Sequence, residues 1–186
     1  MQRLIAIASA AAALALAGCA TAPPPTSHET PQLRLAPSLL GRPLNLQQHL
    51  TLQAPGREQQ LDVLLEADAR HVQMGLVAMG QVAARLDWDG TTLAETKAPW
   101  WPEAVSGSRI LSDLQLTLWP VDAIQAALPP GWRLAEDGNV RTLTQDGQVV
   151  TVITRRGPLL VELDQQREHF KLTIESRELV NDAAAK

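Results

Sequence analysis

Cysteine is almost absent from this chain: Cys19 is the only one among 186 residues. A single thiol excludes a disulfide within the chain, so the folded domain must be stabilised by packing. The chain also has no tyrosine and only one phenylalanine. Aspartate and glutamate number 20 against 16 lysines and arginines, and the longest basic run is the pair Arg155 and Arg156. A chain without a basic patch is not expected to bind nucleic acid.

The N-terminal segment has the pattern of a signal peptide. Arg3 precedes an apolar stretch at residues 4–16, which is too short to span a bilayer. The sequence Leu-Ala-Gly-Cys at positions 16–19 resembles the bacterial lipobox. This resemblance implies cleavage before Cys19, a diacylglycerol on its thiol and an acylated new N-terminus. Two or three acyl chains hold a protein on a bilayer almost permanently.

The residues after Cys19 bear on which membrane holds the protein. Ala20 and Thr21 follow the cysteine. In lipoproteins of this kind, an aspartate just after the cysteine commonly signals retention in the inner membrane. Its absence predicts a lipid anchor in the outer membrane, on the periplasmic face of a Gram-negative cell. Apart from the covalent lipid on Cys19, no cofactor is expected.

The composition predicts four regions along the chain. Residues 1–18 are the signal peptide, and residues 19–40 are the lipidated N-terminus and a proline-rich tether without apolar periodicity. Residues 41–178 suffice for a single β-rich domain that buries roughly 70% of its unfolded surface. Residues 179–186 are predicted to be a disordered tail.

Apolar residues recur at every second position from Leu44 onward, which is the period of a strand with one buried face. A two-residue Asp-Gly hairpin signal stands at positions 89 and 90. The expected strands of this first, antiparallel meander are 44–52, 61–67, 72–78, 82–88 and 91–97. Strand signals resume after a gap, at 132–134, 140–145, 149–154, 159–163 and 170–174.

The gap between the two sets of strands has helical spacing. Apolar residues at 110, 111, 114 and 118 predict one helix, and Pro120 ends it and suits the first turn of a second. The predicted fold is mainly β with a helical insert (α+β), a curved antiparallel sheet or incomplete barrel covered by two short helices. Core and cavity-lining residues have the same period, so both a filled and a hollow interior remain open.

Twelve residues of the helical insert and of the strands after it follow a pattern that is also found in a known protein family. They are Leu111, Asp113, Leu114, Gln115, Leu116, Trp119, Pro120, Gly131, Trp132, Leu134, Arg141 and Leu143. In these the chain resembles a family of bacterial outer-membrane lipoproteins of unknown function that is associated with aryl polyene biosynthesis genes. The segment from Asp87 to Gly90 also resembles the family's hairpin, although its usual tyrosine is missing.

The order of lipidated cysteine, strands, helical pair and more strands is similar to the LolA and LolB lipoprotein carriers. There an incomplete barrel with a helical lid shelters acyl chains. The resemblance implies an apolar cavity between sheet and helices, with Leu65, Met74, Leu86, Leu111, Leu114, Leu118 and Trp119 as candidate lining residues. It also makes Met79, in the loop 78–80, a candidate membrane-inserting residue. The alternative is that Met79 simply ends a buried strand.

Four of the five tryptophans stand next to the predicted helices, in two pairs. Trp100 and Trp101 stand between the first meander and the first helix, where they would form an apolar rim or plug one end of the barrel. Trp119 and Trp132 flank the second helix and are expected to fix it to the sheet.

No catalytic motif is present. His49, His71 and His169 have no partner at metal-ligand spacing, and the chain lacks a nucleophile elbow and a glycine-rich phosphate loop. The protein is therefore not expected to be an enzyme. Two functions remain: binding or transferring a lipid or acylated cargo at the membrane, or serving as an envelope scaffold with a solid core that binds a protein partner.

Overall fold

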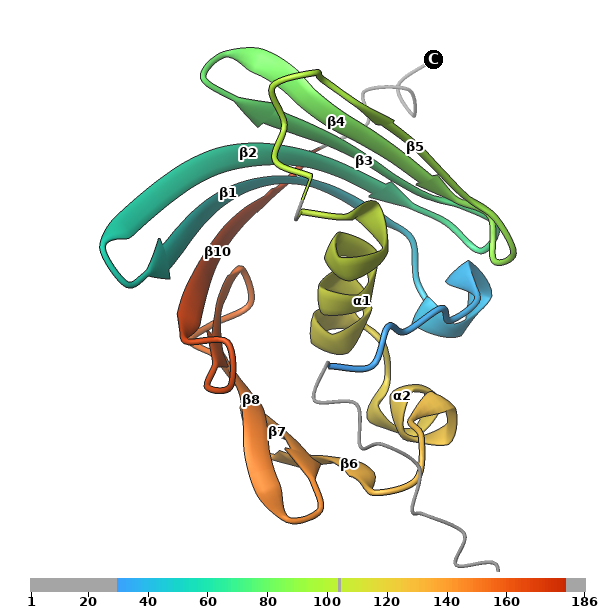
Figure 1. Cartoon of the computed structure of the whole chain (residues 1–186). Helices are drawn as coiled ribbons and strands as arrows, with labels where there is room; N and C mark the ends of the chain where they lie inside the picture. The colour runs from blue at the N-terminus through green and yellow to red at the C-terminus, as the bar shows by residue number, and fades with distance from the viewer. Residues whose placement is uncertain (1–29, 104, 180–186) are drawn as a thin grey trace, which may run out of the picture.

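The computed structural model describes residues 30–103 and 105–179 (Figure 1). The predicted signal peptide, Cys19 and most of the predicted tail lie outside these residues. Within them, no helix combines the length and apolar character needed to cross a membrane.

A single antiparallel sheet of ten strands forms most of the molecule. The strands are β1 (Leu44–Ala54), β2 (Arg57–Ala67), β3 (Val72–Ala78), β4 (Gln81–Trp88), β5 (Leu93–Lys97), β6 (Trp132–Asp137), β7 (Val140–Gln145), β8 (Gln148–Arg155), β9 (Leu160–Gln165) and β10 (Phe170–Glu178). Their order is β5-β4-β3-β2-β1-β10-β9-β8-β7-β6. The predicted mainly β, α+β fold is thus confirmed as one open, curved sheet with edges at β5 and β6.

The sheet consists of two five-strand meanders joined by the first and last strands. β1 pairs with β10 over eight residue positions, from Leu46 opposite Glu178 to Gln53 opposite Lys171. Figure 1 shows the joined sheet curving around α1. Side chains on the concave face are mostly apolar and buried, because alternate residues of every strand point toward the helices.

Two helices lie on the concave side, where the helical spacing predicted them. α1 (Gly107–Leu118) begins at Ser106, whose hydroxyl accepts a hydrogen bond from the backbone N–H of Arg109 at 3.2 Å. Pro120 ends α1 and precedes α2 (Val121–Ala127). Gly107 lets α1 approach the sheet closely, since a Cβ atom there would lie 2.5 Å from Cδ2 of Leu86.

Residues 30–40, which the sequence assigns to the tether, pack against the rest of the described domain. Residues 30–36, which we call the strap, run along α1 and lead into a short 3-10 helix (Pro37–Leu40). Leu33 and Leu35 are 4% and 6% exposed. The backbone N–H of Leu35 donates to Gln115 Oε1, and Gln115 Nε2 donates back to the Leu35 carbonyl, both at 2.9 Å. The strap is therefore part of the core.

Candidate functional site

The predicted cavity-lining residues come together between the sheet and α1. Leu65, Met74 and Leu86 stand opposite one another on β2, β3 and β4 and face the helix. They share one apolar cluster with Leu111, Leu114 and Trp119, and Leu118 packs against it. Leu65 and Leu111 are only 1% exposed and Trp119 is fully buried, so other atoms fill the space around them. In this arrangement an acyl chain would enter here only if α1 moved.

A second group of apolar side chains on the same concave face is incompletely covered. It belongs to β1, β2, β9 and β10, and its members are partly buried against the core: Leu50, Leu61, Val161, Phe170 and Leu172. We call this group the apolar band. Its register is continuous, because Leu50 faces Leu61 on one side and Ile174 on the other, and Ile174 faces Val161. These residues were not singled out in the sequence, where they alternate like every core position.

An open pocket adjoins the apolar band at the ends of β1, β9 and β10. Its volume is about 550 Å³. Phe170 belongs to both the band and the pocket lining, where it lies with Gln165 and His169. The rest of the lining includes Ala54 and Pro55 at the turn between β1 and β2, and Gln53, Lys171 and Asp164, which the register places side by side on the outer face of the sheet. The pocket therefore opens around the strand ends, and Phe170 is the band residue that borders it.

A partly buried ionic cluster stands at the edge of this opening and joins α1 to the turn between β9 and β10. Arg109 donates through Nε to Asp113 at 2.9 Å and through a terminal nitrogen to Glu168 at 2.7 Å. Its guanidinium carbon also lies 5.9 Å from the centre of the Phe170 ring. These four side chains tie the N-terminal half of α1 to the sheet beside the apolar band.

The first residue of the strap completes this cluster. The Thr30 hydroxyl donates to Glu168 at 3.4 Å, and the buried amide of Gln165 lies 3.1 Å from the same hydroxyl. Thr30, Gln165, Arg109, Asp113 and Glu168 together form what we call the Arg109 cluster. Three segments distant in the sequence meet in it, which is why no local motif predicts it.

The carboxyl group of Asp113 has a raised pKa in the folded protein. Removal from water raises the pKa of Asp113 from 3.8 to about 6, although the positive charge of Arg109 opposes the change. Since the folded form then binds this proton more tightly than the unfolded chain does, the contribution of Asp113 to stability is largest below about pH 4. It is lost as the pH rises from about 4 to 6.

Asp113→Asn should therefore change how stability depends on pH. We expect the unfolding free energy of the wild-type protein, measured relative to the variant, to fall by on the order of 1–2 kcal/mol between pH 4 and pH 7. Urea unfolding of both proteins at several pH values measures this difference. A constant difference across that range would show that Asp113 keeps an ordinary pKa in the folded protein.

The other end of α1 is held by a buried arginine. One terminal nitrogen of Arg141 donates to the carbonyl oxygens of Leu116, Thr117 and Trp119, at 3.0, 3.2 and 2.8 Å. Helix C-termini leave such carbonyls without partners within the helix. Arg141, on β7, is only 5% exposed and also pairs with Glu136. Arg141 is among the residues in which the sequence resembles the lipoprotein family, but that resemblance implied no role for it.

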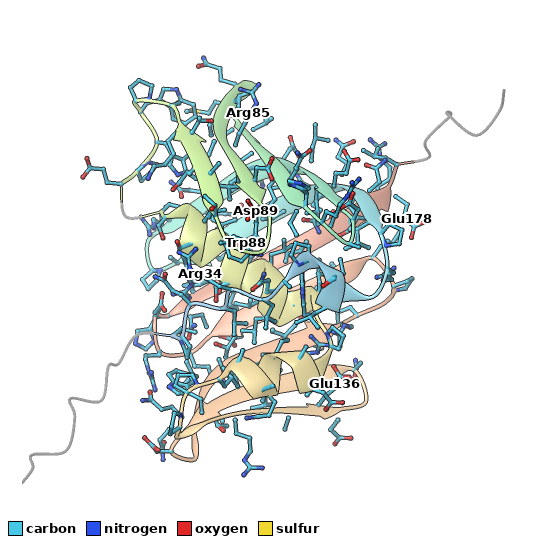
Figure 2. The ribbon with its side chains drawn as sticks, turned by 90° about the vertical axis from the view of Figure 1, so that its right-hand side faces the viewer. Arg34, Arg85, Trp88, Asp89, Glu136 and Glu178 are labelled. Atoms are coloured by element: carbon cyan, nitrogen blue, oxygen red, sulfur yellow. The ribbon has the colours of Figure 1, made fainter. Side chains whose placement is uncertain are left out.

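A second arginine supports the same helix end from β8. Arg155 donates to the Thr117 carbonyl at 3.1 Å and to Glu136 at 2.9 Å. Glu136 on β6, which is labelled in Figure 2, thereby links the two arginines. The strands β6 to β8 thus hold the C-terminal end of α1, while the Arg109 cluster holds its N-terminal half.

Met79 lies in the turn between β3 and β4 rather than in a buried strand. Its side chain is 83% exposed, and its backbone φ of 52° is left-handed, as a tight turn requires. Val82, at the start of β4, is 44% exposed. Trp100 is 42% exposed and packs edge-to-face on Trp101, with the ring centres 6.3 Å apart. This end of the sheet therefore presents several apolar side chains to solvent.

The tryptophans next to α2 are fixed in the core, as predicted. Trp119 donates from its indole to the Ala36 carbonyl at 3.2 Å, and Trp132 is 7% exposed on β6. Gln125 of α2 contacts the same strand, because its Oε1 accepts from the N–H of Leu134 at 2.8 Å.

The histidines lie apart from one another. His49 pairs with Asp62 at 2.9 Å and His71 with Asp87 at 3.0 Å, in both cases on the exposed face of the sheet. His169 stands in the turn between β9 and β10 and lines the pocket. In residues 30–103 and 105–179, no three histidine, cysteine, aspartate or glutamate side chains gather closely enough to hold a metal ion.

Comparison with protein families finds one that matches residues 45–178, which run from the second residue of β1 to the last residue of β10. Its description is "Protein of unknown function (DUF3261)". No curated protein matches the chain.

Proposed function

The chain belongs to the DUF3261 family of proteins of unknown function, and we propose that it is a non-enzymatic lipoprotein that binds an acyl chain against the apolar band. The observation that carries this proposal is the band itself, five apolar side chains left partly uncovered on the concave face beside an open pocket of about 550 Å³. Soluble domains bury such surface unless a ligand covers it.

Burial of methylene groups supplies the binding energy in this proposal. Each CH₂ removed from water contributes about 0.8 kcal/mol, so a long acyl chain needs no specific polar contact to bind. The polar walls of the pocket, including Gln165 and His169, are then available to the head group. α1 lies beside this site rather than over it, and the Arg109 cluster holds the helix in that position.

The arrangement of sheet and helices supports a carrier more than a scaffold. A curved open sheet with helices in its concave side is similar to the LolA and LolB architecture, in which the space under the lid shelters acyl chains. Here that space is filled, so the acyl chain is proposed to lie next to α1, on the apolar band. The proposed cargo is accordingly the acyl part of a lipoprotein or, given the association of the resembling family with aryl polyene genes, a polyene lipid.

Leu61→Lys tests the site with a matched control on the same strand. The lysine stem can remain on the apolar surface while its ammonium group points into the opening. We expect at least a tenfold loss of affinity for a fluorescent long-chain fatty acid, measured by titration of residues 19–186 carrying Cys19→Ser. Leu64→Lys, on the opposite face of β2 where the leucine is 52% exposed, should bind like the parent.

Two outcomes of this titration would contradict the proposal. Equal affinity of the Leu61→Lys and Leu64→Lys variants would place the ligand elsewhere. A parent protein that takes up no fatty acid would favour the scaffold function instead.

We further propose that a lipid on Cys19 anchors the protein to the periplasmic face of the outer membrane, with Met79 directed at the bilayer. In this proposal residues 19–29 connect the anchor to the strap, and 11 extended residues would reach at most about 40 Å. Cys19→Ala should leave the protein in the soluble fraction or as an uncleaved precursor after cell fractionation. Membrane attachment of a Cys19→Ala protein that has the mature, cleaved length would refute the anchor.

A further inference from the structure

An open groove of about 640 Å³ crosses the outer face of the sheet, on the side opposite α1. Its centre is Gly75 on β3, where an added Cβ atom would meet no other atom within 4 Å. The register places Leu64 of β2 and Arg85 of β4 on either side of this glycine. Leu64 is 52% exposed, which leaves an apolar wall in contact with water.

The groove also offers charges without partners. Among the residues that the structure describes, the side chains of Arg85 (Figure 2) and Glu66 form no ion pair or hydrogen bond. Asp87, also in the lining, is by contrast held by His71 and Gln73, each at 3.0 Å. The groove therefore combines an apolar wall, an empty centre and one free charge of each sign.

The described chain ends at the mouth of this groove. Leu179 belongs to its lining, and Asn45 of β1 holds it there: the Leu179 N–H donates to the Asn45 carbonyl at 2.9 Å, and Asn45 Nδ2 donates to the Leu179 carbonyl at 3.3 Å. Seven residues follow, with the sequence Val-Asn-Asp-Ala-Ala-Ala-Lys.

Residues 180–186 are long enough to cross the groove. The groove lining extends from Asn45 on β1 to Thr96 on β5. These strands are four spacings of nearly 5 Å apart, so this part of the groove is about 19 Å long. Seven extended residues reach about 23 Å. Asp182 is the third residue after Leu179, so it can advance about 10 Å. Leu179 continues β10 beside β1, so Gly75 on β3 lies three strand spacings away from it, about 14 Å. The side chains of Asp182 and Arg85 can span the remaining distance.

We propose that residues 180–186 bind in this groove, with Val180 against Leu64 and Asp182 paired with Arg85. The alanines at 183–185 are small enough to continue across the shallow remainder of the groove toward β5. The tail then covers the one large apolar side chain that β2 exposes on its outer face and supplies the missing partner of Arg85. This proposal is independent of the acyl site, which lies on the opposite face of the sheet.

Disulfide trapping tests the placement of the tail. In the chain from residue 19 onward with Cys19→Ser, no thiol remains, so Gly75→Cys and Ala183→Cys introduce the only pair. The control pair is Gly157→Cys with Ala183→Cys. Gly157 also has open space around it. It lies in the turn between β8 and β9, which a bond from the Ser176 N–H to the Leu159 carbonyl at 2.7 Å places beside the end of β10.

An unbound tail would meet Gly157 at least as readily as Gly75, because β9 is nearer to the end of β10 than β3 is. We therefore expect the pair at 75 and 183 to form its disulfide in a glutathione buffer at least tenfold faster than the control pair. Equal rates, or a faster control, would overturn the proposal and leave the groove to another chain.

Charge reversal tests the assigned ion pair. Arg85→Glu should lower the rate of the cross-link between 75 and 183 severalfold, and adding Asp182→Lys should restore it. If Arg85→Glu left the cross-linking rate unchanged, or if adding Asp182→Lys did not restore the rate, Asp182 would not be paired with Arg85.

Discussion

Arg141→Met is expected to lower the unfolding free energy by about 3 kcal/mol, because it leaves buried acceptors without a donor. The arginine serves three carbonyl oxygens at the end of α1 and pairs with Glu136. Methionine keeps much of the side-chain volume, so the loss reports the polar contacts more than a cavity. Urea unfolding followed by circular dichroism measures it.

Arg155→Met is the matched control for this prediction. Arg155 reaches the same helix end and the same Glu136, but its side chain is 30% exposed, so water can replace it. We expect this variant to lose less than about 1 kcal/mol. If both variants lost the same amount, the special role of Arg141 as the buried cap of α1 would be wrong.

Trp119→Ala is expected to have the largest effect of any single truncation, about 4 kcal/mol. The side chain is fully buried between α1, α2 and the strap, and its indole holds the Ala36 carbonyl. For a domain of this size, such a loss lowers the melting temperature by roughly 8–16 °C.

Trp100→Ala is the matched control, because it removes a tryptophan that is not buried in the core. Its ring is 42% exposed in the loop after β5, so we expect a loss of no more than about 1 kcal/mol. Calorimetry measures both variants without depending on tryptophan fluorescence. A Trp119→Ala protein that melts like the Trp100→Ala protein would contradict the packing around the strap.

Local periodicity predicted the fold well where neighbouring strands are also neighbours in sequence. Alternating residues and the Asp-Gly turn place β1 to β5, and the change to helical spacing places α1 and α2. The pairing of β1 with β10 joins residues more than 100 positions apart, such as Leu46 and Glu178, and no local pattern specifies it.

The strap shows the limit of composition as a guide. Leu33 and Leu35 are only two apolar residues in a proline-rich stretch, which is typical of a tether. They are buried because Gln115 and Ser112 on α1 satisfy the strap's backbone groups. Such side-chain-to-backbone bonds depend on the tertiary structure and leave no periodic signal.

The candidate site was predicted in part. Leu65, Met74, Leu86 and Leu111 do meet under α1, as the shared face of their strands and helix implied. The uncovered residues, such as Leu61 and Phe170, have the same alternation as their covered neighbours. Only the position of α1 on the sheet separates the two groups, and that position rests on Arg109 and Arg141, whose partners are distant in sequence.

Photoaffinity labelling is the measurement that tests the proposed acyl site most directly. A long-chain fatty acid with a diazirine near its methyl end would be cross-linked to the chain from residue 19 onward, and the labelled side chains located by mass spectrometry. We predict saturable labelling of the apolar band, at Leu50, Leu61, Val161, Phe170 and Leu172. No saturable labelling, or labelling confined to the outer face around Leu64 and Gly75, would contradict the account.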